Sequence, residues 1–240
     1  MTEAAARYEG KVVLVTGSRR GIGLLIVEHF LAHGARVIGF ARGESTVTHQ
    51  NYVHVQVDIG DPVAVQRAFA ELKKVTRVLH ILVNNAAVIT SQYAMILPAA
   101  AAQAMLATNV MGTFMVSREA SKLMRKAKWG RIINIGSMAA KLEPIGDSMY
   151  AASKAALSSL ANVMAKELAP LHITCNTVGV TAIHTDMLAQ LSAAKIAEVV
   201  AALPIPRFAE PDDILNVIDF LASERSGYIT AQSIYLGGVS

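Results

Sequence analysis

The stretch VVLVTGSRRGIG, residues 12–23, places an uninterrupted apolar run directly before a glycine-rich turn. A continuous run of this kind is typical of a parallel strand that is buried on both faces of a sheet. Gly17, Gly21 and Gly23 allow a tight turn, and the residues that follow have the composition of a helix. A strand, a tight turn and a helix in this order predict the start of a βαβ unit.

The same alternation of short β-branched runs and longer helical segments continues along the chain. The predicted strands are Lys11–Thr16, Arg36–Phe40, Val53–Val57, Ile81–Asn84, Arg131–Ile135, Ile173–Val178 and Ser233–Leu236. The predicted helices are Ile22–Ala32, Pro62–Lys74, Ala99–Lys126, Met149–Leu168 and Pro211–Ala222. We therefore expect an α/β protein in which residues 11–240 form a single Rossmann-type domain, a doubly wound parallel sheet with helices on both faces. Residues 1–10 are expected to form an N-terminal tail.

Composition narrows the class of protein. The chain has 240 residues, a hydrophobic share of 53% and a mean hydropathy of +0.40. No charged residue occurs between His80 and Arg118, but Asn84 and Pro98 interrupt this stretch, so no membrane span is expected. The first ten residues lack the basic and then apolar pattern of a secretory signal. The single cysteine, Cys175, excludes an intrachain disulfide and a cysteine-rich metal site, and a cytoplasmic protein without a metal is expected.

The glycine-rich turn also predicts a binding site for a dinucleotide. Backbone N–H groups at a helix N-terminus attract phosphate, and glycines let a pyrophosphate approach the backbone closely. The spacing from Gly17 to Gly23 is G-x-x-x-G-x-G and not the commoner G-x-G-x-x-G, and a tight turn without a ligand is the competing interpretation. The position of the turn, between the first strand and the first helix, favours the dinucleotide.

The charge at the end of the second strand predicts which dinucleotide binds. A carboxylate there would hold the ribose 2′-hydroxyl of NAD and repel a 2′-phosphate. The strand instead continues into Ala41 and Arg42, and Arg20 is placed to reach the same region. Two guanidinium groups suit a phosphate, so NADP(H) is the expected cofactor. Asp58, after the third strand, either accepts a hydrogen bond from an adenine amino group or caps the turn before Pro62.

A second group of residues indicates proton transfer. Tyr150 and Lys154 lie four residues apart in a predicted helix and therefore project from one face. A neighbouring ammonium is expected to lower the pKa of the phenol and make Tyr150 a general acid–base group, although a surface pair has the same spacing. Ser137 follows the fifth strand, where its hydroxyl could hold a carbonyl oxygen. Asn109, within a long apolar helix, either bonds to the backbone or supports a lysine and a water.

Together these motifs resemble the classical short-chain dehydrogenase/reductase family, from about Lys11 to Gly238. The resemblance rests on TGSRRGIG (16–23), Asp58, Asn84-Asn85-Ala86, Asn109, Ser137, YAASK (150–154) and HTDM (184–187). RFAEP (207–211) and FLAS (220–223) are similar to the 3-oxoacyl-(acyl-carrier-protein) reductase branch of that family. The resemblance implies NADPH-dependent reduction of a ketone, such as a 3-oxoacyl thioester, to a secondary alcohol by hydride transfer.

The resemblance also implies a role for each residue of the site. Tyr150 would be the acid–base group, and Lys154 would lower its pKa and bind the ribose. Ser137 would donate to the substrate oxygen, and Asn109 would anchor a water behind Lys154. The implied cofactor contacts are Gly17, Arg19, Arg20, Gly21, Ile22, Gly23, Arg42, Asp58, Ile59, Asn85, Ala86, Tyr150, Lys154, Ile183 and Thr185. Of these, Ile183 and Thr185 would hold the nicotinamide carboxamide.

Some positions depart from the family pattern. Ala87 stands where the family has a glycine after Asn-Asn-Ala, and Val180-Thr181 replaces a Pro-Gly pair after the sixth strand. Leu236 replaces the polar residue that usually precedes Gly237-Gly238. These departures leave the placement of the nicotinamide open.

The sequence does not name the substrate. Candidate pocket residues are Tyr93, Met138, Glu143, Ile145, Met187 and Leu191. One alternative function is an NAD-dependent dehydrogenase of a dihydrodiol in aryl-acid biosynthesis, whose sequences are similar around Tyr150–Ala169, but Arg42 counts against NAD. Another is a non-catalytic cofactor-binding scaffold, against which the intact set of Asn109, Ser137, Tyr150 and Lys154 argues.

Residues 118–131 contain six basic residues opposed only by Glu119. They form either a solvated helix end or a docking patch for an acidic carrier protein at Arg125, Lys126 and Lys128. The carrier-protein reductases dock through a basic pair; Lys128 matches one position, whereas Leu171 occupies the other. Nucleic acid is not expected as a partner, because the segment offers only one aromatic ring for stacking.

The uncharged stretch before Arg118 and a face of small residues on the helix that carries Tyr150 predict a homotetramer of two-fold symmetry. The small residues are Ala155, Ser158, Ala161 and Ala165.

Overall fold

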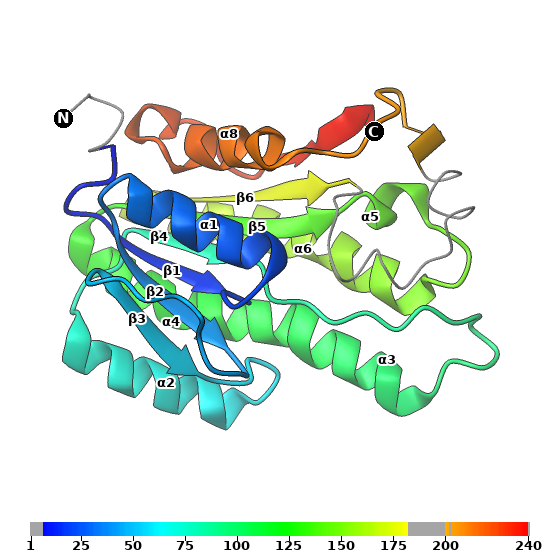
Figure 1. The fold of residues 1–240 in the computed structure, drawn as a ribbon, viewed down its shortest axis with the longest axis horizontal. Helices are drawn as coiled ribbons and strands as arrows, with labels where there is room; N and C mark the ends of the chain where they lie inside the picture. Colours follow the sequence, from blue (N-terminus) through cyan, green and yellow to red (C-terminus); the bar gives the residue numbers. More distant parts are fainter. Residues whose placement is uncertain (1–6, 182–199, 202, 240) are drawn as a thin grey trace.

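A computed structural model describes residues 7–181, 200–201 and 203–239. Its strands form one seven-stranded parallel sheet in the order β3-β2-β1-β4-β5-β6-β7 (Figure 1). The strands are β1 (Val12–Thr16), β2 (Arg36–Ala41), β3 (Tyr52–Gln56), β4 (Ile81–Asn84), β5 (Gly130–Ser137), β6 (Ile173–Val180) and β7 (Ser233–Tyr235). The strand order reverses between β1 and β4. In open α/β sheets, the ligand crevice lies beyond the carboxyl ends of the strands at such a reversal.

Helices cover both faces of the sheet, as the sequence predicts. They are α1 (Gly21–Ala32), α2 (Pro62–Val75), α3 (Ala99–Met105), α4 (Thr113–Ala127), α5 (Ala139–Leu142), α6 (Ser148–Leu168) and α8 (Pro211–Ala222), with 3-10 turns at Ala169–Leu171, Glu224–Ser226 and Leu236–Gly238. Helices α1 and α8 pack on one face around Phe30 and Ile218 (Figure 1). Helices α2, α4 and α6 pack on the other face around Phe69 and Met164. Burial on both faces explains why the central strands are continuous apolar runs.

The predicted helix Ala99–Lys126 changes its hydrogen-bonding pattern midway. Helix α3 runs into a π-helical segment, η2 (Leu106–Gly112), which continues into α4. Segments of this kind occur frequently at functional sites, and Asn109 lies at the centre of η2. Among the described residues, the combined helix Ala99–Ala127 is long and apolar enough to cross a membrane, but it packs against the sheet through α4. Only 33% of its most apolar stretch is buried, so its outer side carries apolar surface.

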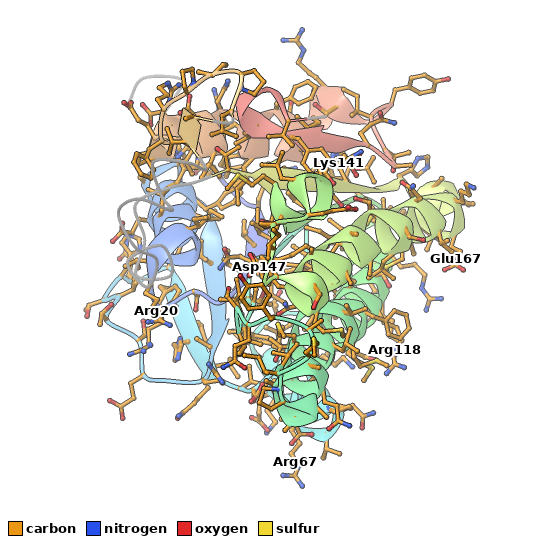
Figure 2. The ribbon with its side chains drawn as sticks, turned by 90° about the vertical axis from the view of Figure 1, so that its right-hand side faces the viewer. Arg20, Arg67, Arg118, Lys141, Asp147 and Glu167 are labelled. Atoms are coloured by element: carbon orange, nitrogen blue, oxygen red, sulfur yellow. The ribbon has the colours of Figure 1, made fainter. Side chains whose placement is uncertain are left out.

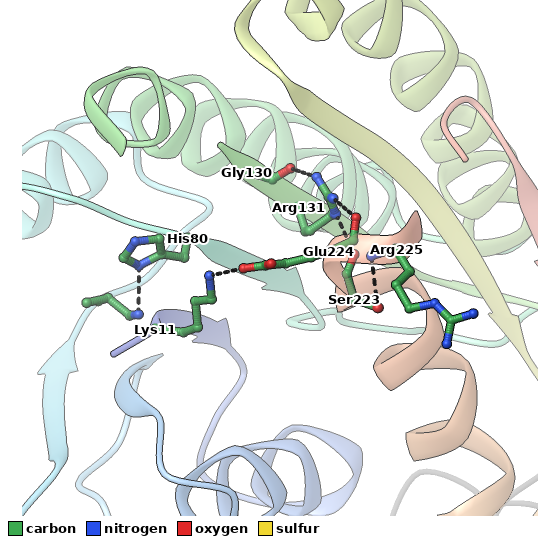
Figure 3. A network of polar contacts seen from close by, with 8 residues as sticks. Lys11, His80, Gly130, Arg131, Ser223, Glu224 and Arg225 are labelled. Carbon is green, nitrogen blue, oxygen red and sulfur yellow. Dashed lines mark hydrogen bonds and ion pairs between the residues drawn. The ribbon is translucent and has the colours of Figure 1, made fainter. Parts of the chain in front are cut away.

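A network around Arg131 joins the amino-terminal end of the sheet to the segment after α8 (Figure 3). The buried guanidinium donates to the carbonyl oxygens of Ser223 at 3.1 Å and Glu224 at 3.3 Å. Its Cζ lies 4.3 Å from the centre of the Trp129 ring, and the Lys11 ammonium lies 4.6 Å from the same ring. Lys11 also pairs with Glu224 at 2.6 Å. Arg131 therefore belongs to the interior, and not to the basic surface that the sequence suggests.

Residues 7–10, assigned to a tail from the sequence, contact α1 and α8. The ring of Tyr8 is buried, and its hydroxyl donates to Asp219 of α8 at 2.5 Å. His29 of α1 lies 2.8 Å from the same carboxylate oxygen. Burial and the adjacent carboxylate raise the pKa of Tyr8 far above its ordinary value. This short segment thus ties the two helices on one face together.

Candidate active site

The glycine-rich turn between β1 and α1 packs so closely against neighbouring protein atoms that Gly17 and Gly23 have no space for a side chain. Gly17 has a φ of +68°, and a Cβ there would lie 2.7 Å from Asn85 Nδ2 and 2.9 Å from Ala86 Cα. A Cβ on Gly23 would lie 2.1 Å from the carbonyl oxygen of Gly17. Among the described residues, no side-chain cap is found at the first turn of α1, and this turn contains no acidic residue. The positive end of the helix dipole therefore faces the turn, an arrangement that suits a phosphate.

Thr16 and Asn85 hold the glycine-rich turn to the end of β4. The Thr16 hydroxyl accepts hydrogen bonds from the backbone N–H groups of Asn85 and Ala86, both at 3.0 Å. The Asn85 amide donates to the carbonyl oxygens of Thr16 at 3.0 Å and Gly17 at 3.3 Å. Thr16 belongs to the quoted motif TGSRRGIG, but it was not among the predicted cofactor contacts. The available signal was a hydroxyl at the end of a buried strand, which requires a partner.

Three arginines lie around the end of β2. Arg19, Arg20 and Arg42 are exposed. Figure 2 looks onto the carboxyl edge of the sheet and shows Arg20 there, at the start of α1. A Cβ on Gly43 would lie 3.1 Å from Arg19 Nε, so the Arg19 side chain lies against the turn that carries Arg42.

Asp58 and Ile59 follow β3. The Asp58 carboxylate accepts from the Gly60 N–H at 2.9 Å, which closes the turn after the strand. Helix α2 is capped by Asp61, whose carboxylate accepts from the N–H groups of two residues in the first turn at 2.8 and 3.2 Å. Asp58 thus closes the turn before Pro62, one of its two predicted roles, whereas the cap of α2 is Asp61, which was not predicted. Ile59 is buried, and its carbonyl oxygen would lie 2.7 Å from a Cβ on Gly112.

Tyr150 and Lys154 project from α6 toward the end of β5, and both are buried. The Lys154 ammonium donates to the carbonyl oxygen of Ile135 at 2.8 Å and lies 5.9 Å from the centre of the Tyr150 ring. The hydroxyl of Ser137, at the end of β5, accepts from the Ala139 N–H at 3.1 Å. The three proposed catalytic side chains therefore meet at the carboxyl edge of the sheet.

The charges at this edge correct one expectation. Burial raises the pKa of the Tyr150 phenol, and the hydrogen bond with Ser137 opposes this only partly, while the charge of Asp147 raises it further. The sequence predicts a lowered pKa caused by Lys154. In the structure the ammonium is directed onto the Ile135 carbonyl, and loss of hydration dominates at the phenol. Burial also lowers the pKa of Lys154 to about 8.

Asn109 connects η2 to both sides of the site. Its buried amide donates to the carbonyl oxygen of Val88 at 2.9 Å and to the Ser153 hydroxyl at 3.0 Å, and its oxygen accepts from the Val88 N–H at 2.8 Å. Ser153 in turn donates to the carbonyl oxygen of Tyr150 at 2.7 Å. Of the two sequence interpretations, the structure shows backbone bonding by the side chain. Ser153, which sequence reasoning passed over within YAASK, links Asn109 to the helix turn of Tyr150.

Two loops border the site on the side away from the glycine-rich turn. The Gln92 N–H donates to the carbonyl oxygen of Gly146 at 2.8 Å, and Ser91 donates to Asp147 at 2.5 Å. Figure 2 shows Asp147 on the same edge of the molecule as Arg20. The joined loops carry exposed apolar side chains, among them Met95, Ile96 and Ile145.

The candidate pocket residues are only partly described. Tyr93 is 67% exposed and Ile145 is 77% exposed; Glu143 is also exposed. The N–H of the half-buried Met138 donates to the carbonyl oxygen of Val180 at 2.9 Å. Four further predicted residues lie outside the described residues: Ile183, Thr185, Met187 and Leu191. Within residues 7–181, 200–201 and 203–239, no group of three or more His, Cys, Asp or Glu side chains could hold a metal ion.

Comparison with known proteins gives one consistent result. The family model described as short chain dehydrogenase matches residues 11–196. The 3-oxoacyl-(acyl-carrier-protein) reductase FabG of Escherichia coli is 33% identical, over 96% of this chain and 97% of its own length. The FabG of Aquifex aeolicus is 32% identical, over 97% of this chain and 98% of its own length.

Two solved structures are also similar to this chain: the name of one gives gluconate as a substrate, and the name of the other gives the same family. A putative gluconate dehydrogenase from Agrobacterium tumefaciens is 30% identical, with a TM-score of 0.90 and 98% of each chain covered. A protein titled as a member of the short chain dehydrogenase/reductase family is 33% identical, with a TM-score of 0.86 over 97% of this chain and 98% of its own.

Proposed function

The chain belongs to the short-chain dehydrogenase family and is an oxidoreductase, and we propose that it reduces a ketone to a secondary alcohol with NADPH. The observation that carries this proposal is the meeting of Tyr150, Ser137 and Lys154 at the carboxyl edge of β5, on the same edge as the glycine-rich turn. The similarity to reductases of 3-oxoacyl carrier-protein substrates supports a 3-oxoacyl thioester as the substrate class.

The residues around the glycine-rich turn fit a nicotinamide dinucleotide. Gly17 and Gly23 keep the turn compact, because a Cβ at either position would collide with neighbouring protein atoms, and the start of α1 would hold the pyrophosphate. Arg19, Arg20 and Arg42 would bind a 2′-phosphate, and Lys154 would hold the nicotinamide ribose. The bound cofactor would supply the hydride. Asp58, Asn85 and the neighbouring Ile59 and Ala86 would complete the cofactor contacts, as the sequence implies.

The protonation states suit reduction. Because burial raises the pKa of Tyr150, the phenol keeps its proton at neutral pH and is a proton donor. The pKa of Lys154, about 8, leaves most of the ammonium charged at pH 7, where it would stabilise the phenolate that remains after proton transfer. Ser137 would orient the carbonyl oxygen toward Tyr150. Asn109 would hold α6 and the segment after β4 in register, and the proposed water behind Lys154 would lie at η2.

The proposal is tested by following NADPH oxidation with a panel of ketones. The panel includes an acetoacetyl thioester of pantetheine, a simple β-ketoester, and a cyclic diol assayed in reverse with NAD. We expect turnover with the thioester and NADPH, and much slower turnover with NADH. Faster oxidation of the cyclic diol with NAD would favour the dihydrodiol dehydrogenase. The absence of turnover with every substrate, despite tight NADPH binding, would favour the scaffold.

The basic segment 118–131 offers a smaller docking surface than its sequence suggests. Glu119 pairs with Arg118 at 3.2 Å and with Lys122 at 2.6 Å. Burial alone would raise the pKa of Glu119. The hydrogen bonds and positive charges of Lys122 and Arg118 outweigh burial and lower this pKa. Arg131 is buried. Three exposed cations remain at the end of α4, and we propose these as the contact for an acidic carrier protein: Arg125, Lys126 and Lys128.

We also propose a cytoplasmic homotetramer. The outer sides of α3–η2 and α6 expose Leu106, Met111 and Val163, an apolar surface that a second copy would cover. The small-residue face on α6 does not point outward as a whole. Ala161 and Ala165 are buried against the sheet, because α6 packs on β5 and β6 through them.

A further inference from the structure

A chain of polar contacts on β3 joins the glycine-rich turn to the turn after β2. Tyr52 and His54 are two residues apart and lie on one face of the strand. The Tyr52 hydroxyl lies 3.4 Å from Ser18 Oγ and 3.3 Å from His54 Nδ1. His54 Nε2 lies 2.9 Å from the carbonyl oxygen of Gly43. One phenol and one imidazole thus bridge two turns that are 25 residues apart in sequence, from Ser18 to Gly43.

The local backbone is built around this bridge. A Cβ on Gly39 of β2 would lie 2.0 Å from the Tyr52 hydroxyl and 2.5 Å from Ser18 Oγ. The phenol therefore crosses β2 at the glycine, which is the partner of His54 in the parallel register. Ser18 is fully buried, so the Tyr52 hydroxyl reaches an interior group of the glycine-rich turn. A bulkier residue at Gly39 would block the crossing.

The bridge fixes the segment that carries the arginines. The Gly43 carbonyl is held by His54, and the Arg42 carbonyl accepts from Gln56 Nε2 at 2.7 Å. Two consecutive peptide groups are therefore fastened to β3 by side chains of that strand. Arg19 lies against the same Gly43. Any movement of this peptide would change the spacing between the Arg19 and Arg42 guanidinium groups.

We propose that His54, supported by Tyr52, is a positioning residue for recognition of the 2′-phosphate of the cofactor. The inference rests on the proposed preference for NADP(H) and explains how two exposed arginines are held for one phosphate. A carbonyl oxygen only accepts hydrogen bonds, so His54 Nε2 carries the proton that binds Gly43. Nδ1 is then an acceptor, and it lies within reach of the single Tyr52 hydroxyl proton, as does Ser18 Oγ. Fixing the turn before the ligand arrives reduces the ordering cost of binding.

The first test uses adenosine 2′,5′-bisphosphate and AMP, which differ only in the 2′-phosphate, with affinities measured by calorimetry. His54→Leu should weaken the bisphosphate about five- to tenfold and leave AMP unchanged, as expected for one lost hydrogen bond and a looser turn. His54→Gln, whose amide can still donate to Gly43, should stay within about threefold of the natural protein. The matched control is His49→Asn, at an exposed histidine before β3; asparagine keeps an acceptor for the Asn51 N–H, which His49 Nδ1 accepts at 3.1 Å, and the variant should change neither affinity.

A double-mutant cycle separates positioning from a merely structural effect. Because His54 acts through Arg42, His54→Leu should have little further effect on the preference for the bisphosphate once Arg42 is alanine. Equal weakening of both nucleotides, or an undiminished preference for the bisphosphate, would overturn the inference. If the natural protein bound both nucleotides equally, the proposed NADP(H) preference would itself fail, a result distinct from failure of the bridge.

Tyr52→Phe is a second test of the bridge, for use if the His54→Leu protein does not fold. The substitution removes only the phenol oxygen and keeps the ring packed over Gly39. It should lower the preference for the bisphosphate about two- to threefold, because His54 would lose the partner at Nδ1. An unchanged preference in a folded Tyr52→Phe protein would contradict the role of the bridge.

Discussion

The Lys154 ammonium lies 2.8 Å from the carbonyl oxygen of Ile135, so a buried cation of α6 is fastened to the strand that ends at Ser137. This contact fixes where the charge sits relative to the Tyr150 ring, 5.9 Å from its centre. It also places the ammonium among groups that solvate it less well than water, which is why its pKa falls to about 8.

This buried lysine should give the fold a specific dependence on pH. The unfolded chain holds the lysine proton up to its ordinary pKa of 10.5, whereas the folded protein releases it near 8. The unfolded state therefore binds more protons than the folded state between these pH values. As a result, the free energy of unfolding increases as pH rises through this window. Relative to Lys154→Met, the natural protein should gain about 2–3 kcal/mol from pH 8 to 10.5. Urea unfolding of both proteins measures this difference; a constant difference would contradict it.

Tyr150→Phe should lower kcat by about 10²–10⁴, the usual contribution of general acid–base catalysis, and leave NADPH affinity largely intact. Only the hydroxyl is lost, and the ring stays packed against α5. Steady-state kinetics and fluorescence titration with NADPH measure the two effects separately. Tyr228→Phe, at a fully exposed tyrosine, is the matched control and should behave as the natural protein. Retention of most of the rate by Tyr150→Phe would show that another group supplies the proton.

Arg42→Asp should weaken NADPH at least about tenfold while sparing or improving NADH. A charge-assisted hydrogen bond to phosphate contributes about 1.5–3 kcal/mol, and about 1.4 kcal/mol is one decade of affinity. Titration of each cofactor gives both constants. Arg67→Asp makes the same charge change on an exposed residue of α2 and should leave the ratio unaltered. Equal affinities for NADH and NADPH in the natural protein would rule out the proposed specificity.

Assembly is checked by light scattering. Four copies of a 25.5 kDa chain should give about four times that mass at micromolar concentration. Met111→Arg places a charge on the exposed apolar side of η2 and should dissociate the assembly without unfolding the subunit, since the side chain is half exposed. A species of 25.5 kDa in the natural protein would exclude the tetramer.

Ala231→Gly should stabilise the fold by up to about 1 kcal/mol. Ala231 has a φ of +60°, in the left-handed region that costs a residue with a Cβ about 1–2 kcal/mol. Glycine removes this cost, but its greater conformational entropy in the unfolded chain offsets part of the stabilisation. Ala70→Gly, at an exposed position within α2, should instead destabilise by about 1 kcal/mol. Thermal unfolding of the two variants should therefore shift in opposite directions; a shared direction would contradict the strain at residue 231.

The fold could be predicted because its signals are local. Apolar runs such as Val12–Val15 and the glycine-rich turn record burial on both faces and a sharp change of direction, and each lies within a few residues. The bounds Ile81–Asn84 and Pro211–Ala222 agree with the structure. The π-helical segment and the contacts of Asn109 within it were not predicted; these contacts are with Val88 and Ser153, which are distant in sequence.

The electrostatics were the least predictable part of the site. The spacing of Tyr150 and Lys154 indicates that they are neighbours. Whether the nearby charge or burial determines the pKa of the Tyr150 phenol, however, depends on how much water reaches it. The same limit applies to Arg131 and Tyr8. Composition classes one as a surface cation and the other as part of a tail, and only the packed chain shows that both are interior.

Trp129 is the single tryptophan of the chain; Lys11 and Arg131 both contact its ring, and it directly precedes β5, at the opposite edge of the sheet from Tyr150. Its emission is therefore an intrinsic optical reporter of that edge alone. A substitution at the chemical end that leaves the emission maximum and quenching by iodide unchanged has had a local effect. A shift in the emission maximum or in the quenching would show that the substitution also changes the structure at the opposite edge of the sheet.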